Sequence, residues 1–141
     1  MKKISIIITL LLVLAASAIA FADTDAELQK LAQPMMDNIN KAIETKNFDM
    51  YLKDCDDGMK AALTKAKFME LCDFQEKQLG NLTSLKFHQV LKQNDMAKVV
   101  WKGKFSKQSK DMLLELVLKK YPKGWKVAGH WMRFDTPQPG K

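Results

Sequence analysis

The spacing of apolar residues changes at Thr83, and this change constrains the fold more than any other feature of the 141-residue sequence. Before Thr83 the apolar residues recur at intervals of three and four, which is the period of one face of an α-helix. After Thr83 they alternate with polar residues, which is the period of a β-strand. The chain is therefore expected to be an α+β domain, with its helices first and its strands afterwards.

Three amphipathic helices are predicted before Thr83. The first begins at the capping box Thr24-Asp25-Ala26-Glu27, where the Thr24 hydroxyl and the Glu27 carboxylate can satisfy the first free amide groups. It ends at Lys46-Asn47, and Pro34 predicts a kink or a restart within it. A short second helix spans 48–55 and stops at Asp56-Asp57-Gly58. The third begins after Thr64 and ends at Gly80.

Four strands are predicted after Thr83, over residues 84–93, 97–105, 112–121 and 125–134. The connections are short and contain turn residues such as Asn94-Asp95 and Pro122-Lys123-Gly124, so consecutive strands should pair as an antiparallel meander. The expected architecture is three N-terminal helices packed on one face of this four-stranded sheet. Alternation sorts the strand side chains into a core face and an outer face. Gly103 and Gly129 are the two positions where a bulge would reverse the assignment downstream.

The N-terminal residues are typical of a secretory signal peptide. Met1-Lys2-Lys3 precedes an apolar block from Ile4 to Ala20, and Ala20-Phe21-Ala22 is a small-residue cleavage motif. The block is shorter than the roughly 20 residues of a membrane-spanning helix, although an uncleaved anchor is the alternative. Residues 1–22 are expected to be removed by cleavage after Ala22, which leaves a periplasmic or extracellular protein. The predicted domain then covers 23–136, with a flexible tail at 137–141.

The two cysteines, Cys55 and Cys72, allow two interpretations. Disulfides persist in exported proteins, so the pair could form a bridge. Free cysteines are also common as small buried apolar residues. The sequence does not fix the separation of the two Cα atoms, and both interpretations stay open.

Several short motifs resemble the nuclear transport factor 2-like (cystatin-like) superfamily, and within it a family of small secreted prokaryotic domains of unknown function. The motifs are Asn47-Phe48-Asp49-Met50-Tyr51 with Met59-Lys60, Leu63-Thr64 with Phe68, 79–84, and 124–131 with Pro137. The resemblance implies a cone-shaped α+β fold. It implies no activity, because the superfamily contains enzymes, binding modules and dimerisation domains. No catalytic residue can be carried over from it.

A cone of this kind often encloses a pocket between its sheet and its helices. The residues expected to line such a pocket are Tyr51, Phe68, Gln75, Gln89, Trp101 and Trp131. A few polar groups in an apolar cavity are typical of a site for a small apolar or amphipathic ligand. A filled core with satisfied polar groups is the alternative.

The outer sheet face is a second candidate surface. Its expected members are His88, Val90, Val100, Leu113, Val117, His130 and Met132. An apolar strip rimmed by lysines would suit a homodimer or a protein partner. Nucleic acid is not expected as a partner, because the protein is predicted to be exported and stacking aromatics are not predicted on this strip.

The sequence contains no recognised catalytic motif, no cofactor-binding motif and no set of residues at metal-ligand spacing. Its prediction is therefore an exported, non-catalytic ligand-binding or protein-interaction module, without a cofactor. The alternative is a small-molecule enzyme of isomerase or hydratase type that uses the cone pocket. An inward histidine or carboxylate with a shifted pKa beside the pocket would favour the enzyme. A filled interior would favour the module.

Overall fold

The computed structural model describes residues 23–135, so the predicted signal peptide and C-terminal tail lie outside the described residues. The helices in this range are α1 (Asp25–Glu44), α2 (Phe48–Leu52), α3 (Asp57–Ala62), α4 (Lys65–Phe74) and the π-helix η1 (Gln75–Leu79). The strands are β1 (Leu82–Gln93), β2 (Met96–Phe105), β3 (Met112–Tyr121) and β4 (Gly124–Phe134). The predicted α+β class is confirmed.

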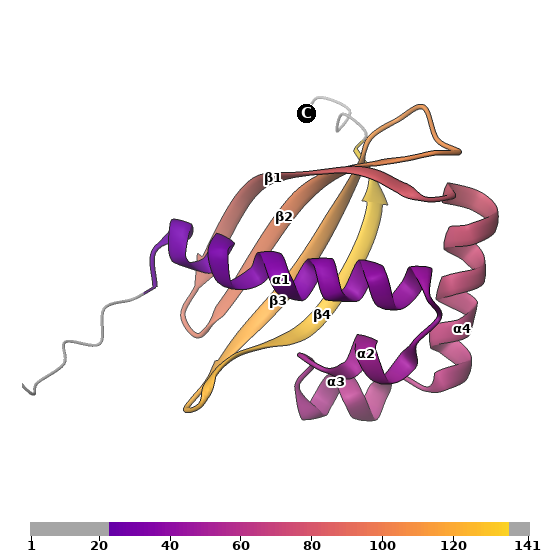
Figure 1. Ribbon diagram of the computed structural model, residues 1–141. Coiled ribbons are helices and arrows are strands. Elements are labelled where there is room, and N and C mark those ends of the chain that lie inside the picture. Colours follow the sequence, from indigo (N-terminus) through magenta and orange to yellow (C-terminus); the bar gives the residue numbers. More distant parts are fainter. Residues whose placement is uncertain (1–22, 136–141) are drawn as a thin grey trace, which may run out of the picture.

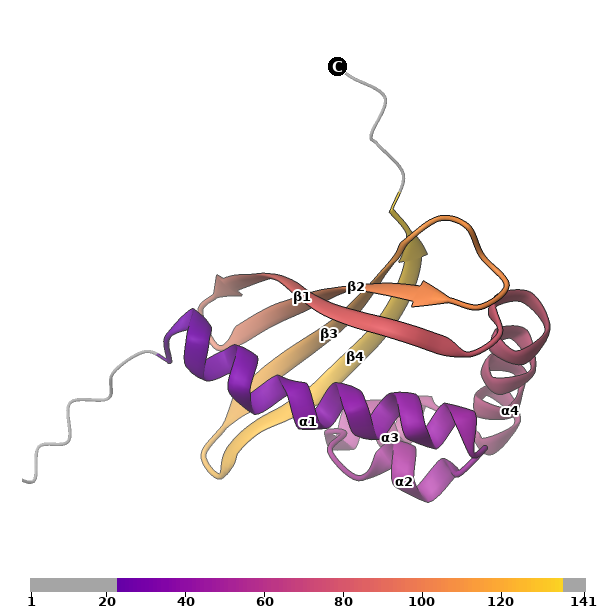
Figure 2. The ribbon, with the colours of Figure 1, turned by 45° about the horizontal axis from the view of Figure 1, so that its top comes forward.

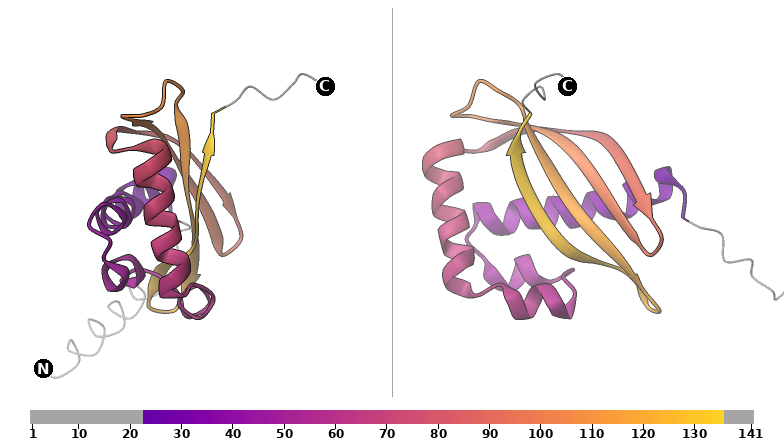
Figure 3. Two further views of the ribbon diagram at one scale, coloured as in Figure 1. Left: turned by 90° about the vertical axis from the view of Figure 1, so that its right-hand side faces the viewer. Right: turned by 180° about the vertical axis from the view of Figure 1, so that it is seen from behind.

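The strands form one antiparallel sheet in the order β1-β2-β3-β4, which is the predicted meander. Helix α1 crosses one face of the sheet, and the shorter helices gather near its C-terminal end (Figure 1). Seen along the sheet, the helices lie on the same side of it (Figure 3). We call the helix-covered side the inner face and the opposite side the outer face. No helix within residues 23–135 combines the length and apolarity that a membrane crossing requires.

Local signals explain most of the helix boundaries. The Thr24 capping box is present, with the Glu27 amide donating to Thr24 Oγ1 and the Thr24 amide donating to Glu27 Oε2. Pro34 lies inside α1 without a restart, so that part of the prediction is wrong. Ala32 and Met36 are fully buried on either side of Pro34. Their packing holds the helix together where one backbone hydrogen bond is lost.

Helix α3 is absent from the sequence prediction. Asp56 begins it as the N-cap, accepting a hydrogen bond from the Met59 amide at 2.8 Å. The same short aspartate side chain favours turns and helix starts alike, and the sequence pattern alone suggested a stop. The segment before α3 also pairs with β4, since the Asp56 amide donates to the Val127 carbonyl and the Val127 amide donates to the Asp54 carbonyl.

Two bulges reverse part of the predicted face assignment. In β4, Val117 pairs with Gly129 and Leu118 pairs with Val127, so Ala128 is the extra residue. In β1, Phe87 pairs with Trp101 and Gln89 pairs with Val100, so His88 is the extra residue. An extra residue moves every later side chain to the other face. The prediction is therefore wrong for five of the candidate site residues: Gln89 and Trp131 lie on the outer face, and Val90, His130 and Met132 lie on the inner face.

Candidate functional site

The interior of the cone is filled where a pocket was predicted. Tyr51, Phe68 and Trp101 are at most 3% exposed and belong to one packed core. The Tyr51 and Phe68 ring centroids are 5.1 Å apart, and Trp101 Nε1 donates to Gln33 Oε1 at 2.9 Å. The described part of the chain has one cleft beside α1, η1 and β1 and a second between the β1–β2 hairpin and Val117. Because Gln89 and Trp131 lie on the outer face, Gln75 is the one predicted pocket residue that lines either of these two clefts.

A cleft of about 720 Å³ lies elsewhere, between the C-terminal half of α1, η1 and the start of β1. The three elements can be followed in Figure 2, where β1 runs beside α1 and the α4–η1 segment leads into β1. The lining consists of α1 and turn residues, η1 residues and β1 residues: Asp37, Asn40, Lys41, Ile43, Glu44, Thr45, Lys46, Cys72, Gln75, Glu76, Gly80, Asn81, Leu82 and Leu85. Its volume lies within the range of small-molecule sites, about 300–1,000 Å³.

Two amide side chains in this cleft have buried polar atoms without partners. Asn40 Nδ2, Asn40 Oδ1 and Gln75 Oε1 are buried, and none has a hydrogen-bond partner within residues 23–135. Gln75 is only 6% exposed. A buried polar group left unpaired costs about 1–3 kcal/mol, and such groups need an explanation in a native protein. The unpaired groups of these two cleft residues are therefore two acceptor oxygens and one NH2 donor group.

The sequence contained a signal for Asn40 that the pattern analysis missed. Asn40 follows the buried Met36 by four residues and precedes the buried Ile43 by three. That spacing places it at the border of the apolar stripe of α1. A polar residue at such a position is a candidate for a binding role.

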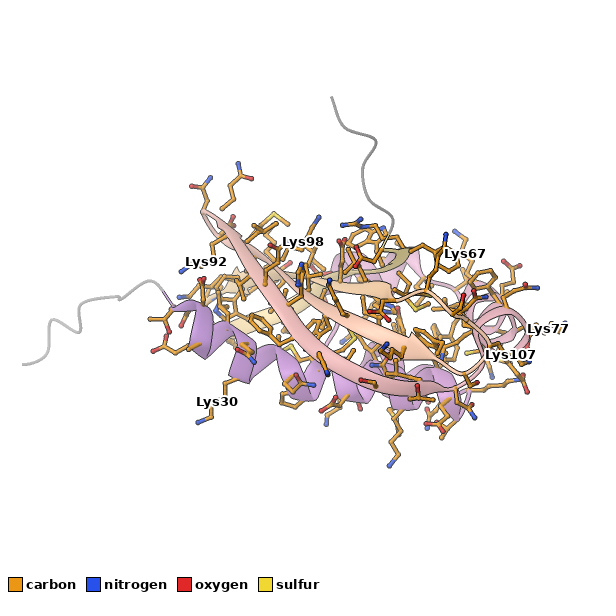
Figure 4. All side chains as sticks on the ribbon, turned by 90° about the horizontal axis from the view of Figure 1, so that it is seen from above. Lys30, Lys67, Lys77, Lys92, Lys98 and Lys107 are labelled. Carbon is orange, nitrogen blue, oxygen red and sulfur yellow. The ribbon has the colours of Figure 1, made fainter. Side chains whose placement is uncertain are left out.

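The π-helix fixes the wall that carries Gln75. Helix α4 continues into η1, and the Gly80 amide donates to the Gln75 carbonyl at 2.7 Å. The β2–β3 loop holds the next carbonyls, with Lys107 Nζ donating to Glu76 O at 2.8 Å and Gln108 Nε2 donating to Gln78 O at 2.7 Å. Figure 4 shows Lys107 and Lys77 at this helical end of the molecule. Single π-turns are frequent at functional sites.

The lining of the cleft is close to electrically neutral. It contains the carboxylates of Asp37, Glu44 and Glu76 and the ammonium groups of Lys41 and Lys46. Lys46 Nζ lies 2.8 Å from Glu76 Oε2 and 3.4 Å from Asp73 Oδ1. These contacts raise the pKa of Lys46 and lower the pKa of Glu76. Lys46 is therefore already paired, whereas three polar atoms of Asn40 and Gln75 have no partner within residues 23–135.

His130 lies on the inner face as a result of the β4 bulge. Tyr51 Oη and His130 Nδ1 are 2.8 Å apart, and His130 Nε2 is buried with no partner among the described residues. Burial lowers the pKa of His130 to about 4 and raises the pKa of Tyr51. Both side chains are therefore neutral at neutral pH. Neither of them lines the two described clefts.

Both cysteines are free and buried in the structure, as in the second of the two interpretations. Cys55 Sγ lies 3.3 Å from the Tyr51 carbonyl oxygen. Burial, followed by the charges of Asp54 and Asp56, raises the pKa of Cys55 to about 11, and burial raises the pKa of Cys72. Thiols of this kind are poor nucleophiles at neutral pH, because the thiolate is the reactive form.

Some of the residues predicted on the outer face lie there in the structure. Val100, Leu113 and Val117 lie there, in register with Glu115 and its neighbours. Glu115 is only 6% exposed and pairs with Arg133 at 3.1 Å and Lys98 at 3.6 Å. Trp131 is 53% exposed and lies against Gly129, where a Cβ atom would collide with its indole ring. His88 is exposed at the β1 bulge.

Within residues 23–135 no cluster of side chains suited to a metal ion occurs.

Comparisons with known proteins show structural neighbours only. No family model and no curated protein matches the chain. Similar solved structures include a SEC-C motif containing protein from Rhodopseudomonas palustris, with a TM-score of 0.49 and 11% identity over 69% of this chain and 74% of that one. Bd1075 of Bdellovibrio bacteriovorus has a TM-score of 0.48 and 14% identity over 80% of this chain and 42% of that protein.

A third neighbour is an NTF-2 like protein of unknown function from Burkholderia xenovorans. It has a TM-score of 0.42 and 11% identity over 80% of this chain and 89% of that one. Its description matches the superfamily that the sequence resembles. Likenesses this distant carry no argument about function. The confirmed fold class rests on the chain's own helices and sheet.

Proposed function

We propose that the protein is an exported binding module that holds a small, uncharged polar ligand in the cleft between α1, η1 and β1. The observation that carries this proposal is the set of three buried, unpartnered amide atoms on Asn40 and Gln75. A ligand that donates to Asn40 Oδ1 and Gln75 Oε1 and accepts from Asn40 Nδ2 would remove their desolvation penalty. The near-neutral lining supports an uncharged ligand.

The filled interior supports a binding module over an enzyme. Tyr51, Phe68 and Trp101 pack where a reacting substrate would have to sit. The cleft-lining polar atoms without partners among residues 23–135 belong to amides, which bind and orient ligands but do not titrate. These two amides can bind a ligand but cannot act as acid or base.

An enzyme is the second candidate because His130 faces inward with a lowered pKa, and perturbed residues of this kind cluster at active sites. A catalytic base must be within reach of its substrate, so His130 should then react with diethyl pyrocarbonate in the native protein. His88, which is exposed, is the internal control. The binding-module proposal expects His88 alone to be modified. Modification of both histidines at similar rates would favour the enzyme.

The binding proposal is tested with a ligand panel and a matched pair of variants. The mature domain is mixed with uncharged oligosaccharides, small amides and capped peptides, and binding is measured by native mass spectrometry and by thermal shift. Gln75→Met should lose binding, whereas Gln78→Met should keep it, because Gln78 lies on the same π-helix with an exposed side chain. Equal binding by both variants, or no binding by any compound, would contradict the proposal.

A further inference from the structure

The two edge strands of the sheet differ in their backbone hydrogen bonds to the rest of the chain. At the β4 edge, the segment 54–56 pairs with Val127 through two backbone hydrogen bonds of 2.8 Å. At the β1 edge, no backbone hydrogen bond from outside the sheet reaches residues 82–93 within the described part of the chain. A strand with one free edge presents a row of unpaired N–H and C=O groups. The free edge is therefore the one that borders the cleft.

The cleft and the free edge share residues. Leu82 and Leu85, in the first half of β1, line the cleft together with Asn40 and Gln75. Bulges at Thr83 and His88 limit the regular part of β1 beside the cleft to Ser84–Phe87. This length suits a segment of a few residues rather than a long added strand.

The unpartnered amide of Asn40 has the donor and acceptor pattern of a strand residue. In an antiparallel hydrogen-bonded pair, one residue offers its N–H and C=O to the same neighbour. The Asn40 side chain also offers an NH2 donor group and a C=O acceptor, and neither has a partner within residues 23–135. Gln75 Oε1 adds an acceptor for a second N–H group. The near-neutral lining adds no strong charge preference.

We propose that the ligand of this cleft is an extended peptide segment of a partner protein, recognised through its main chain between the β1 edge and the amides of Asn40 and Gln75. The inference rests on the proposed binding function and names its ligand class. Recognition of this kind is tolerant of peptide sequence, because main-chain hydrogen bonds supply the affinity.

The test uses a pool of capped, uncharged hexapeptides, and then ester analogues of the best binder. Each ester replaces one backbone N–H with oxygen and leaves the side chains unchanged. We expect at least one ester position to weaken binding about fivefold to tenfold, the value of one hydrogen bond. Bound peptide should also slow hydrogen exchange within 82–87. Asn40→Leu and Gln75→Met should lose peptide binding, and Gln78→Met should retain it.

The contrary outcomes separate this inference from the proposed function. If an uncharged oligosaccharide binds and no peptide does, the cleft is a ligand site and the peptide inference is wrong. The same holds if peptides bind but every ester analogue binds equally well. If two copies of the chain pair along β1, seen as a dimer with protected 82–87 amides in the absence of peptide, the partner is a second copy rather than a foreign segment. If nothing in the panel binds, both proposals fail.

Discussion

At the scale of single residues, Asn40 and Gln75 carry a cost that folding alone does not explain. Their three unpartnered atoms are buried in a wall that is otherwise well hydrogen-bonded. Natural proteins keep such destabilising groups chiefly where they serve function. Stability and binding should therefore respond in opposite directions when these side chains change.

Replacing Gln75 with methionine should stabilise the ligand-free protein. The variant keeps the length of the side chain and removes the buried Oε1 acceptor, so the free energy of unfolding should rise by about 1 kcal/mol. Urea denaturation measures this change. Gln78→Met, at an exposed position, should change stability by less than about 0.5 kcal/mol. A loss of stability in Gln75→Met would show that its amide is satisfied in solution.

His130 should make stability depend on pH between about pH 6.5 and 4. Its pKa is about 4 in the folded protein and about 6.5 when unfolded, so the unfolded state binds a proton first as the pH falls. Above pH 6.5 the full contribution of His130 to the free energy of unfolding is present. Between pH 6.5 and 5 the titration of this residue should lower the free energy of unfolding by about 2 kcal/mol.

The variants His130→Gln and His88→Gln separate this effect from that of other titrating groups. Urea denaturation at several pH values should give a flatter profile for His130→Gln than for the natural chain. His88→Gln should leave the profile unchanged, because His88 is exposed. Parallel profiles for all three proteins would mean that His130 is accessible to protons in the folded state.

At the scale of elements, α1 shows how packing overrides a local breaker. Pro34 lies in the middle of a 20-residue helix whose buried residues include Ala32, Met36 and Ile39. An interior proline costs a helix about 3 kcal/mol relative to alanine. Burial of several fully enclosed side chains, each contributing about 1.5–3 kcal/mol, exceeds that cost.

Pro34→Ala should therefore stabilise the protein. The substitution restores one backbone hydrogen-bond donor in α1, and part of the gain is offset by the greater freedom of the unfolded chain. We expect an increase of about 2 kcal/mol in the free energy of unfolding. Pro122→Ala, in the exposed turn before β4, is the matched control and should not stabilise. An unchanged or lower stability for Pro34→Ala would show that the proline shapes α1 in a way that the fold needs.

At the scale of the whole molecule, contacts between distant parts of the sequence join the residue before the N-cap of α1 to the sheet. Asp23 Oδ2 accepts hydrogen bonds from Trp125 Nε1 at 2.7 Å and Lys120 Nζ at 3.0 Å. Both contacts lower the pKa of Asp23. Asp23 is also the first residue that would remain after the predicted cleavage. The fold therefore holds Asp23 in place through its side chain.

The mass of the protein recovered outside the cytoplasm tests two predictions together, cleavage after Ala22 and the state of the two cysteines. We expect residues 23–141, with both thiols free and alkylated by iodoacetamide only after unfolding, because Cys55 and Cys72 are buried. A mass lower by two hydrogens would indicate a bridge. Retention of residues 1–22 would contradict cleavage after Ala22.

Apart from α3, the sequence alone determined the order of helices and strands, because the apolar period and the caps are local properties. Thr24, Thr64 and Gly80 mark helix ends by the chemistry of a few neighbouring residues. The tertiary structure decided which side chains face which way after His88 and Ala128, since a bulge depends on the partner strand. Gly129 was a local signal for the bulge at Ala128, whereas Gly103 was not followed by one in β2 and His88 had no such signal. The tertiary structure also decided the candidate site. Asn40 and Gln75 are 35 positions apart and meet only through packing, and whether a buried amide has a partner is a property of the assembled fold.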